Sequence, residues 1–405
     1  MKVVIIGGGA AGLMAAVAAA NCGNSVIVVE KNERPALKLR ITGKGRCNIT
    51  NNCPPAEVIA NATRNGRFLY SAVNAFSPAD TIAFFEKLGV PTKTERGRRV
   101  FPQSDKAADV ANALINKAKS SGVKFVTAQA EKLLLQNNTA VGVKLKNSEI
   151  FADKIIIATG GASYPKTGST GDGYKFAKQT GHTVTPIRPS LVPLKSNDDF
   201  ILQLQGLALK NAAIKVTGSS GKVFYTDFGE LLFTHFGVSG PVILSASAHI
   251  PPQAVNSSVL HIDLKPALTV QQLDTRLLRD LTELCNKNAA NILHGLLPKS
   301  LCPIVAKMWG VGDVKCNSVT KEQRRKLCEI LKDFKVNLTD FCPIEEAIVT
   351  SGGVEVSEIN PKTMESKLCK NLFFAGEVID CDAYTGGYNL QIAWSTGWLS
   401  GSGTD

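Results

Sequence analysis

The sequence has no apolar run of the roughly 18–20 residues that a helix needs to cross a bilayer, so no membrane-spanning segment is expected. Its ten cysteines form no C-x-x-C pair, and nothing else in the chain is typical of a disulfide-stapled or zinc-bound domain. We therefore expect no metal site, and reduced thiols in a cytoplasmic protein. The apolar N-terminal stretch resembles a secretory signal, but glycines at 7, 8 and 9 interrupt it where a signal needs a continuous helix.

Composition favours a folded globular protein. A chain of 405 residues with 44% hydrophobic and 20% charged residues can bury a sizeable core, and its length predicts two or three domains. The net charge is +12, and it is unevenly spread, because residues 1–100 contain 14 Lys and Arg against 6 Asp and Glu. This basic first quarter fits a bound polyanionic cofactor, a nucleic-acid surface, or a solvated face without a partner.

The chain opens with the pattern of a dinucleotide-binding βαβ unit. A β-branched run at 2–6 is suited to a strand buried in a parallel sheet. The motif G-x-G-x-x-G follows at Gly7, Gly9 and Gly12 and leads into a helix of small residues. The first glycine makes the tight turn, the second lets a pyrophosphate approach the backbone, and the third lets the helix pack closely on the strand. The helix N-terminus then offers free N–H groups and partial positive charge to the phosphates.

The next strand supplies an acid at the position that the motif requires. Residues 25–29 form a second β-branched run, which ends at Glu30. An acid here accepts hydrogen bonds from the adenosine ribose and disfavours a 2′-phosphate, so the nucleotide is expected to be FAD or NAD. Residues 122–161 contain several short strands and end in a T-G-G turn, but they lack a second G-x-G-x-x-G. A separate NAD-binding Rossmann domain is therefore not visible.

A second glycine-rich turn lies near the C-terminus. The segment FFAGEVIDCDAYTGGYNLQ (373–391) joins a short apolar strand to a helix that glycines open. With the N-terminal unit and the T-G-G turn, it resembles two-dinucleotide-binding-domain flavoproteins. In those proteins the acid of a late A-G-[DE] turn reaches the ribityl chain, and the next helix points its N-terminus at the flavin, where it stabilises the charge of the reduced ring. The resemblance implies that both ends of this chain bind one FAD.

Five further stretches sharpen the resemblance to a single family. They are RITGKGRCNITN (40–51), TERGRRVFPQS (94–104), ATGGASYPKTGSTGDGY (158–174), LLFTHFGVSGP (231–241) and TSGGV (350–354). In this order, and with the 373–391 segment, they closely resemble the bacterial BaiN/RdsA family of FAD-dependent oxidoreductases. That family includes aminoacetone oxidase-like flavoproteins and a flavin-dependent reductase of bile-acid intermediates. The resemblance covers nearly the whole chain.

The resemblance implies an α/β fold in which a Rossmann-like, glutathione-reductase-like FAD-binding domain is interrupted by an insertion. The FAD-binding domain would comprise residues 1–190 and 343–405. The insertion would comprise a small β-barrel at 191–268, where residues alternate as in strands, and a helical part at 269–342, where apolar residues have helical spacing. We expect the insertion to carry substrate specificity.

Motif positions that match the family imply the cofactor contacts. The pyrophosphate, ribose and adenine would be contacted by Gly7, Gly9, Ala11, Gly12, Glu30, Lys31 and the backbone of Ala130. The middle of the cofactor would be lined by Arg46, Cys47 and Asn48, and the neighbouring turn would supply Thr159 and Gly160. The ribityl chain and the ring would be contacted by Gly376, Glu377, Asn389 and Leu390. Many members of the wider superfamily have Asp where this chain has Glu377.

The residues do not decide the electron donor or the proton donor. The flavin supplies the redox chemistry, and the protein supplies position and electrostatics. Without a second Rossmann unit, NADH or NADPH would dock transiently as electron donor, or the substrate would be the donor and oxygen the acceptor. A catalytic residue is not assigned; the candidate proton donors are Tyr164, His235, Tyr384 and Tyr388, and the candidate redox cysteines are Cys47 and Cys381.

Three functions are consistent with these patterns. An FAD-dependent oxidoreductase of a small or lipophilic organic substrate is favoured, either as an NAD(P)H-dependent reductase or as an oxygen-using oxidase. The first alternative is a flavoprotein that binds or modifies tRNA, which predicts salt-sensitive RNA binding. The second is a flavin-bearing scaffold without turnover, which predicts a flavin that no pyridine nucleotide reduces. A small-molecule partner is therefore preferred over a nucleic acid, and no membrane partner is expected.

Overall fold

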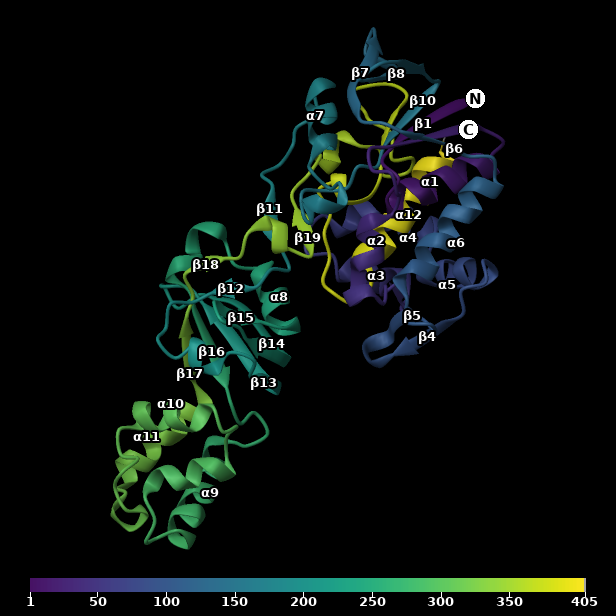
Figure 1. The fold of residues 1–405 in the computed structure, drawn as a ribbon. Coiled ribbons are helices and arrows are strands. Elements are labelled where there is room, and N and C mark those ends of the chain that lie inside the picture. Colours follow the sequence, from purple (N-terminus) through teal and green to yellow (C-terminus); the bar gives the residue numbers. More distant parts are fainter. Residues whose placement is uncertain (404–405) are drawn as a thin grey trace. The chain divides into compact units, whose positions relative to one another are not determined.

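The computed structural model describes residues 1–403, and the chain divides into two compact units. Met1–Ser190 and the segment from Pro343 to the C-terminus form the first unit, and Leu191–Cys342 form the second (Figure 1). Within the described residues, every helix is too short or too polar to cross a membrane.

A five-stranded parallel sheet forms the centre of the first unit. The order of its strands is β20 (Leu372–Phe374), β10 (Lys154–Ile157), β1 (Lys2–Ile6), β2 (Ser25–Glu30) and β6 (Lys124–Thr127). Each neighbouring pair is parallel. Residues 3–6 of β1 and 155–157 of β10 are all buried, as is usual for parallel strands covered on both faces. The C-terminal strand β20 thus joins the sheet one strand away from the N-terminal strand.

The helices α1 (Ala10–Asn21) and α12 (Tyr388–Ser402) pack on each other through their small residues. A methyl group on Gly397 would lie 2.4 Å from the Ala11 carbonyl oxygen, and one on Gly401 would lie 2.3 Å from that of Ala15. Such close approach of two backbones needs glycine. Because residue 397 faces residue 11 and residue 401 faces residue 15, the two helices run in the same direction.

Further helices and three small sheets complete the first unit. The helices are α2 (Leu37–Ile41), α3 (Pro55–Ala60), α4 (Tyr70–Ala75), α5 (Pro78–Lys87), α6 (Ala107–Ser120) and α7 (Asp172–Gln179). The first antiparallel sheet has the order β7 (Ala130–Gln136), β8 (Thr139–Leu145) and β9 (Glu149–Phe151). The second has the order β3 (Thr50–Asn51), β5 (Arg99–Pro102) and β4 (Thr92–Glu95). The third pairs β11 (Arg188–Ser190) with β19 (Val349–Ser351). The last pair joins the two segments of the first unit on either side of the insertion.

The second unit contains a seven-stranded antiparallel sheet. Its strand order is β17 (Phe334–Asn337), β16 (Val259–Asp263), β13 (Ala208–Thr217), β14 (Val223–Phe233), β15 (Gly237–Ser239), β12 (Leu194–Lys195) and β18 (Asp340–Phe341). Only Leu338 and Thr339 separate β17 from β18, so the chain itself links the two edges of the sheet. Within residues 1–403 no strand pair closes it, and the expected barrel is an open sheet whose edge strands are consecutive in the chain.

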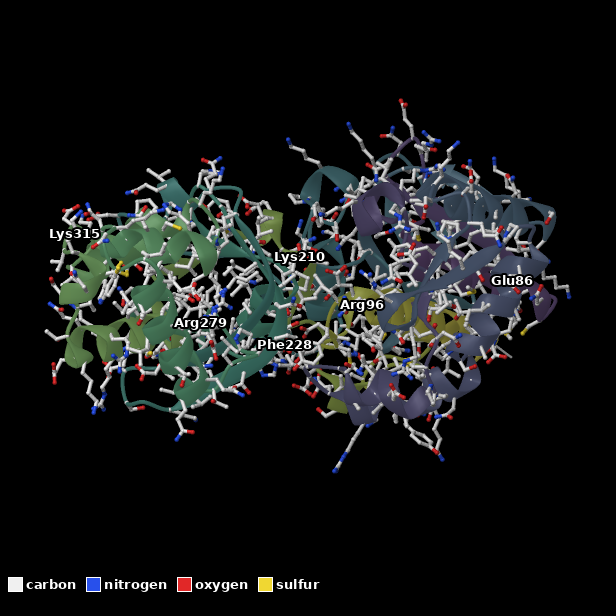
Figure 2. All side chains as sticks on the ribbon, turned by 90° about the horizontal axis from the view of Figure 1, so that it is seen from below. Glu86, Arg96, Lys210, Phe228, Arg279 and Lys315 are labelled. Carbon is white, nitrogen blue, oxygen red and sulfur yellow. The ribbon has the colours of Figure 1, made fainter. Side chains whose placement is uncertain are left out.

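Helices occupy the rest of the second unit. They are α8 (Pro241–Ser247), α9 (Val270–Glu283), α10 (Leu301–Trp309) and α11 (Lys321–Lys332). Capping boxes start α9 at Thr269 and α11 at Thr320, because each threonine and the glutamine three residues later satisfy free backbone N–H groups. The helices end at 332, and residues 334–341 return to the sheet, so the helical part is shorter than the expected 269–342. Figure 2 shows side chains of both units, with Glu86 and Arg96 labelled in the first and Lys210, Phe228, Arg279 and Lys315 in the second.

Candidate cofactor site

The first glycine turn leaves open space above the N-terminus of α1. A methyl group on Gly7, whose φ is 105°, would lie 2.5 Å from the Ala158 carbonyl oxygen at the end of β10. One on Gly12 would lie 1.9 Å from the Gly7 carbonyl oxygen. The packing of the protein itself therefore requires these two glycines. Gly9 differs, because its φ is −81° and a methyl group there would have no heavy atom within 4 Å.

Glu30 lies at the end of β2 and reaches back to this turn. Its Oε2 accepts a hydrogen bond from the Gly8 N–H at 2.7 Å, and its Oε1 accepts from the backbone and side-chain nitrogens of Asn32, each at 2.8 Å. A carboxylate has about four acceptor positions, so capacity for a ribose hydroxyl remains. The Ala128 N–H donates to the Glu30 carbonyl at 2.9 Å, which brings the start of β7 at Ala130 to the same end of the sheet.

The side chain of Lys31 is directed at the loop before α7. Its Nζ lies 2.6 Å from Thr170 Oγ1 and 2.8 Å from Asp172 Oδ2. Burial opposes ionisation of Asp172, but hydrogen bonds from Lys31, Lys175 and Thr170 outweigh it and lower the pKa of Asp172 to about 2. Lys31 therefore ties the end of β2 to the loop that follows the T-G-G turn.

The T-G-G turn carries an unsatisfied polar atom. Thr159 Oγ1 is buried and has no hydrogen-bond partner. Gly160 has φ 74°, and a methyl group there would lie 2.9 Å from Ser169 Oγ. The hydroxyl lies against α7, since a methyl group on Gly173 would be 2.2 Å from Thr159 Oγ1.

The late A-G-E turn lies against the first turn of α1. Gly376 has φ 75°, and a methyl group there would lie 2.7 Å from the Ala11 Cβ. Segments that are hundreds of residues apart in the chain thus meet at one place. This contact brings the two glycine-rich turns together, as the sequence resemblance implies.

Glu377 is the centre of a partly buried hydrogen-bond network. Its Oε2 accepts from Lys38 Nζ at 2.6 Å, and its Oε1 accepts from Ser163 Oγ at 3.0 Å and the Thr350 N–H at 2.8 Å. Lys38 Nζ also donates to Ser163 Oγ at 2.7 Å. Burial alone would raise the pKa of Glu377, but the charge and hydrogen bond of Lys38 and the hydrogen bonds of Thr350 reverse the effect and lower it. The carboxylate is therefore ionised and fixed in position.

Along their common N-to-C direction, α12 starts before α1. Residue 397 of α12 is level with residue 11 of α1, so residue 396 is level with the first residue of α1. Since α12 begins at residue 388, it starts eight residues earlier, or about 12 Å at 1.5 Å per residue. Neither helix has an acidic residue in its first turn, and the first N–H groups of a helix lack intrahelical partners. Two positive helix ends on neighbouring helices, offset along their common direction, suit an extended cofactor with a phosphate end and a ring end.

Of the two residues expected at the ring, one holds the adjacent loop. Asn389 Oδ1 accepts from the Ala383 N–H at 2.9 Å, and its Nδ2 donates to the Ala383 carbonyl at 2.6 Å. Leu390 packs, partly buried, against the core cluster that includes α1. Both residues also present backbone N–H groups in the first turn of α12, and these are the groups that remain for the cofactor.

The loop at 42–48 connects α2 to the same site. Cys47 is fully buried, and Asn48 Oδ1 is a second buried oxygen without a partner. Gly387 leaves no room for a side chain against Thr50, since a methyl group there would lie 2.3 Å from the carbonyl carbon of Thr50. The strand β3, which follows this loop, thus lies directly against the start of α12.

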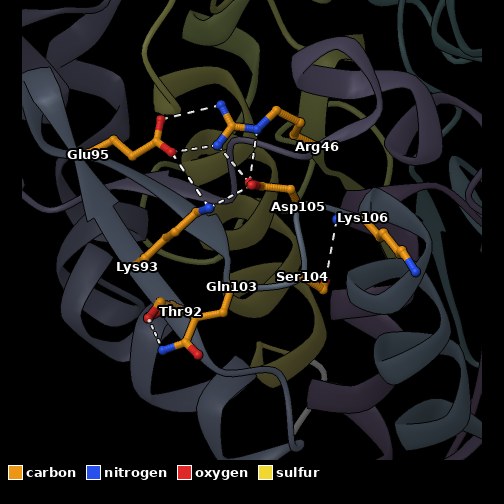
Figure 3. Close-up of polar contacts among 8 residues, drawn as sticks. All are labelled: Arg46, Thr92, Lys93, Glu95, Gln103, Ser104, Asp105 and Lys106. Carbon is orange, nitrogen blue, oxygen red and sulfur yellow. Dashed lines mark hydrogen bonds and ion pairs between the residues drawn. The ribbon is translucent and has the colours of Figure 1, made fainter.

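Arg46 points into a cluster of charged side chains (Figure 3). It contacts Glu95 of β4 at 2.5 Å and Asp105 at 2.6 Å, and Lys93 lies 2.6 Å from the second oxygen of Asp105. The hydrogen bond to Glu95, followed by that to Asp105, raises the pKa of Arg46, and Arg46 in turn lowers the pKa of Glu95. The guanidinium is therefore engaged by the protein.

The structure assigns no proton donor among the candidates. His235 is an exposed residue of the second unit, where its ring lies edge-on to Phe236 with centroids 4.9 Å apart. Burial raises the pKa of the Tyr388 hydroxyl and raises the pKa of the Cys47 thiol to about 12. Burial also raises the pKa of Cys381, together with the neighbouring Asp380 and Asp382. Reactive cysteines need a low pKa, so neither thiol suits a redox role.

The sequence patterns missed the polar partners of Glu377. Lys38, Ser163 and Thr350 lie in stretches that the motifs include or adjoin, but only the fold brings them to one carboxylate. Lys38 and Glu377 are 339 positions apart in the chain. Ser163 and Thr350 belong to the family stretches at 158–174 and 350–354, and this membership is the one signal that marked them.

The residues present fit FAD. Open space above Gly9 and two offset helix N-termini suit a phosphate group, and the unpartnered oxygen of Asn48 suits a polar contact farther along. Within residues 1–403 there is no cluster of three or more His, Cys, Asp or Glu side chains that suits a metal ion.

Comparison with known proteins identifies the family. Residues 1–403 match the family described as HI0933-like protein Rossmann domain. The chain belongs to this family. This result confirms the expected BaiN/RdsA-type resemblance, the Rossmann-like FAD-binding fold and the assignment as an FAD-dependent oxidoreductase.

Two kinds of full-length relative carry different names. The chain is 30% identical over 405 residues to the 3-dehydro-bile acid delta(4,6)-reductase of Clostridium scindens, covering 99% of this chain and 98% of that protein. It is 31% identical over 395 residues to the ribosomal RNA dihydrouridine synthase of Escherichia coli, covering 98% and 96%. A 3-ketosteroid delta1-dehydrogenase from Sterolibacterium denitrificans, 12% identical, superposes with a TM-score of 0.52 over 98% of both chains. This last likeness shows the fold alone.

Proposed function

We propose that this family member is a reductase that adds a hydride and a proton across a C=C bond conjugated to a carbonyl group, with electrons from NADH or NADPH docked transiently. The observation that carries the proposal is the start of α12, which has no acidic residue in its first turn and lies about 12 Å beyond the phosphate turn. A positive helix end at the ring would stabilise the negative charge of a reduced flavin, which is the hydride donor in such reactions.

The names of the relatives support reduction as the common chemistry. A delta(4,6)-reductase of a 3-dehydro compound saturates C=C bonds conjugated to a ketone, and dihydrouridine arises when the C=C bond next to a uracil carbonyl is saturated. Both reactions need a hydride for one carbon and a proton for the other. Reduction therefore explains both names with one site, whereas oxidase chemistry explains neither.

The residues of this chain would hold and orient the cofactor. Gly9 and the start of α1 would bind the pyrophosphate, and Glu30 would accept from the ribose. The turn at Thr159 and Gly160 and the side chain of Asn48 would contact the cofactor, and Glu377, held by Lys38, would face its ribityl chain. FAD supplies the hydride chemistry when it is bound.

A specific observation favours RNA as the substrate. Arg96 and Arg99 are exposed at the tip of the β4–β5 hairpin, and Arg98, also exposed, pairs with Glu57 of α3. Asn51 Nδ2 donates to the Gly97 carbonyl of this tip at 2.9 Å and also to the Gly386 carbonyl at 3.1 Å, just before α12. The basic tip therefore lies beside the start of α12, the proposed ring end of the cofactor site, where it would attract a phosphate backbone. A small conjugated ketone is the second candidate substrate.

The ten cysteines agree with a reducing compartment. All of them are free thiols, and eight are buried. Such thiols persist in the cytoplasm, where NADH and NADPH are also available. We therefore place the proposed activity there.

Anaerobic reduction of the purified holoenzyme tests the proposal. NADH or NADPH should bleach the flavin, and one substrate class should restore its colour without oxygen. The two classes to compare are a steroid with a conjugated 3-ketone and ribosomal RNA that lacks dihydrouridine. Recovery with RNA but not steroid supports the RNA substrate, and the reverse supports the ketone. A flavin that is reduced only by an organic donor, and reoxidised only by oxygen, would refute the reductase.

A further inference from the structure

The loop that carries Arg46, Cys47 and Asn48 has an unusual backbone. Gly43 and Gly45 have φ of 57° and 83°, and Lys44 and Cys47 have φ of 58° and 61°. Glycine adopts this left-handed region freely, but other residues reach it at a cost of about 1–3 kcal/mol each. The path of this loop must therefore be held by contacts with the surrounding protein.

Arg46 makes the contacts that hold it. Its Nη1 and Nη2 donate to both oxygens of Glu95, at 3.3 and 2.5 Å, and its Nε and Nη2 donate to Asp105 Oδ1, at 2.9 and 2.6 Å. The guanidinium also lies over the ring of Phe101, with its carbon 4.1 Å from the centroid. These contacts use all three nitrogens, so the cation is directed at the β4–β5 hairpin. Figure 3 shows this closed arrangement.

The residues on either side of Arg46 show what the loop presents. The Cys47 N–H donates to the Thr42 carbonyl at 3.0 Å, and the Cys47 side chain is fully buried. Asn48 follows directly, with a buried Oδ1 that has no partner. An unsatisfied buried oxygen costs about 1–3 kcal/mol, so Asn48 Oδ1 is free to accept a hydrogen bond from a bound cofactor.

We propose that Arg46 is a positioning residue, which anchors the 42–48 loop to Glu95, Asp105 and Phe101 so that Asn48 and the Cys47 backbone face the cofactor. This replaces the direct cofactor contact that the family resemblance implies for Arg46. The proposal rests on the flavin site of the function proposed above, and it does not depend on the substrate. The acids act through Arg46, and Asn48 acts on the cofactor.

Neutralising the acids separates positioning from direct contact. The variant Glu95→Gln with Asp105→Asn leaves Arg46 in place but releases its guanidinium. If Arg46 positions the loop, this variant and Arg46→Ala should both release FAD from the holoenzyme on the order of tenfold faster, and combining them should add little, because both changes break one unit. If Arg46 instead binds the cofactor directly, a cation freed from its acids should retain FAD as well as the wild type or better.

Three measurements complete the test. FAD release is followed by flavin fluorescence after dilution, and the visible flavin band should shift in the same variants, since the loop contacts the cofactor. Arg46→Lys should restore part of the retention, because lysine keeps the charge but not the bidentate geometry. Arg324→Ala removes a matched two-bond contact to Asp274 in the second unit and should leave release unchanged.

The outcomes are distinct. Faster release and a shifted band in both the acid variant and Arg46→Ala support the positioning role. Faster release in Arg46→Ala alone, or in neither variant, overturns it. A wild-type protein that carries no flavin refutes the proposed function itself, and this is observed before any variant is made.

Discussion

Substitution of Gly9 by alanine should weaken FAD binding while leaving the apoprotein folded. Gly9 has φ −81°, which any residue adopts, and a methyl group there meets no heavy atom within 4 Å. Alanine reduces the entropy of the unfolded chain, which stabilises by about 0.4–1 kcal/mol, but it is a poorer N-cap than glycine by a similar amount. The free energy of unfolding of the apoprotein should therefore change by less than about 1 kcal/mol.

The same methyl group has a different effect on FAD binding. It would occupy the space through which the pyrophosphate approaches the backbone, and forcing one extra carbon into a filled site costs about 1–3 kcal/mol. The dissociation constant for FAD should therefore rise by about 5- to 150-fold. Titration of apoprotein with FAD gives this constant, and thermal unfolding without FAD gives the stability.

Gly12→Ala is the matched control. Its methyl group would lie 1.9 Å from the Gly7 carbonyl oxygen, so the backbone must move and the apoprotein itself should lose stability. Wild-type affinity in Gly9→Ala would refute the placement of the pyrophosphate. An apoprotein destabilised as much as Gly12→Ala would refute the account of open space at Gly9.

Three further substitutions test the charges around the site. Glu30→Ala should weaken FAD binding by about 1–3 kcal/mol through loss of the ribose acceptor, and an unchanged dissociation constant would reject the assigned register. The stabilisation from Glu377 is present above its ordinary pKa of 4.5 and is lost as pH falls through its lowered folded-state pKa. Lys38→Met should raise the pKa of Glu377, so acid unfolding should begin at a higher pH than in the wild type or in the control variant Lys38→Arg. Identical midpoints of acid unfolding would contradict a stabilising ion pair between Lys38 and Glu377. Asp172 contributes on the order of 2 kcal/mol to the free energy of unfolding above pH 3.8, and this contribution is lost as pH falls towards its pKa of about 2. Lys31→Met should remove part of this stabilisation at neutral pH, which urea unfolding would measure.

The sequence by itself determined the dinucleotide-binding unit and the general fold. The G-x-G-x-x-G turn, the β-branched strands around it and the acid at Glu30 act over short distances, so local pattern is enough to predict a dinucleotide-binding unit. The matching motifs along the chain identified the family and implied that the A-G-E turn returns to the same site. The contact between Gly376 and Ala11 shows these turns together.

Only the tertiary structure decided which polar groups are already occupied. The sequence places Arg46 two positions before Asn48, and the family resemblance implies that both face the cofactor. In the fold, Arg46 pairs with Glu95 and Asp105, and an oxygen of Asn48 has no hydrogen-bond partner. Lys38 donates a hydrogen bond to Glu377, although the two residues are 339 positions apart in the chain. Hydrogen bonds and ion pairs act over a few ångströms in space, and no spacing along the chain records which distant side chains the sheet will bring that close.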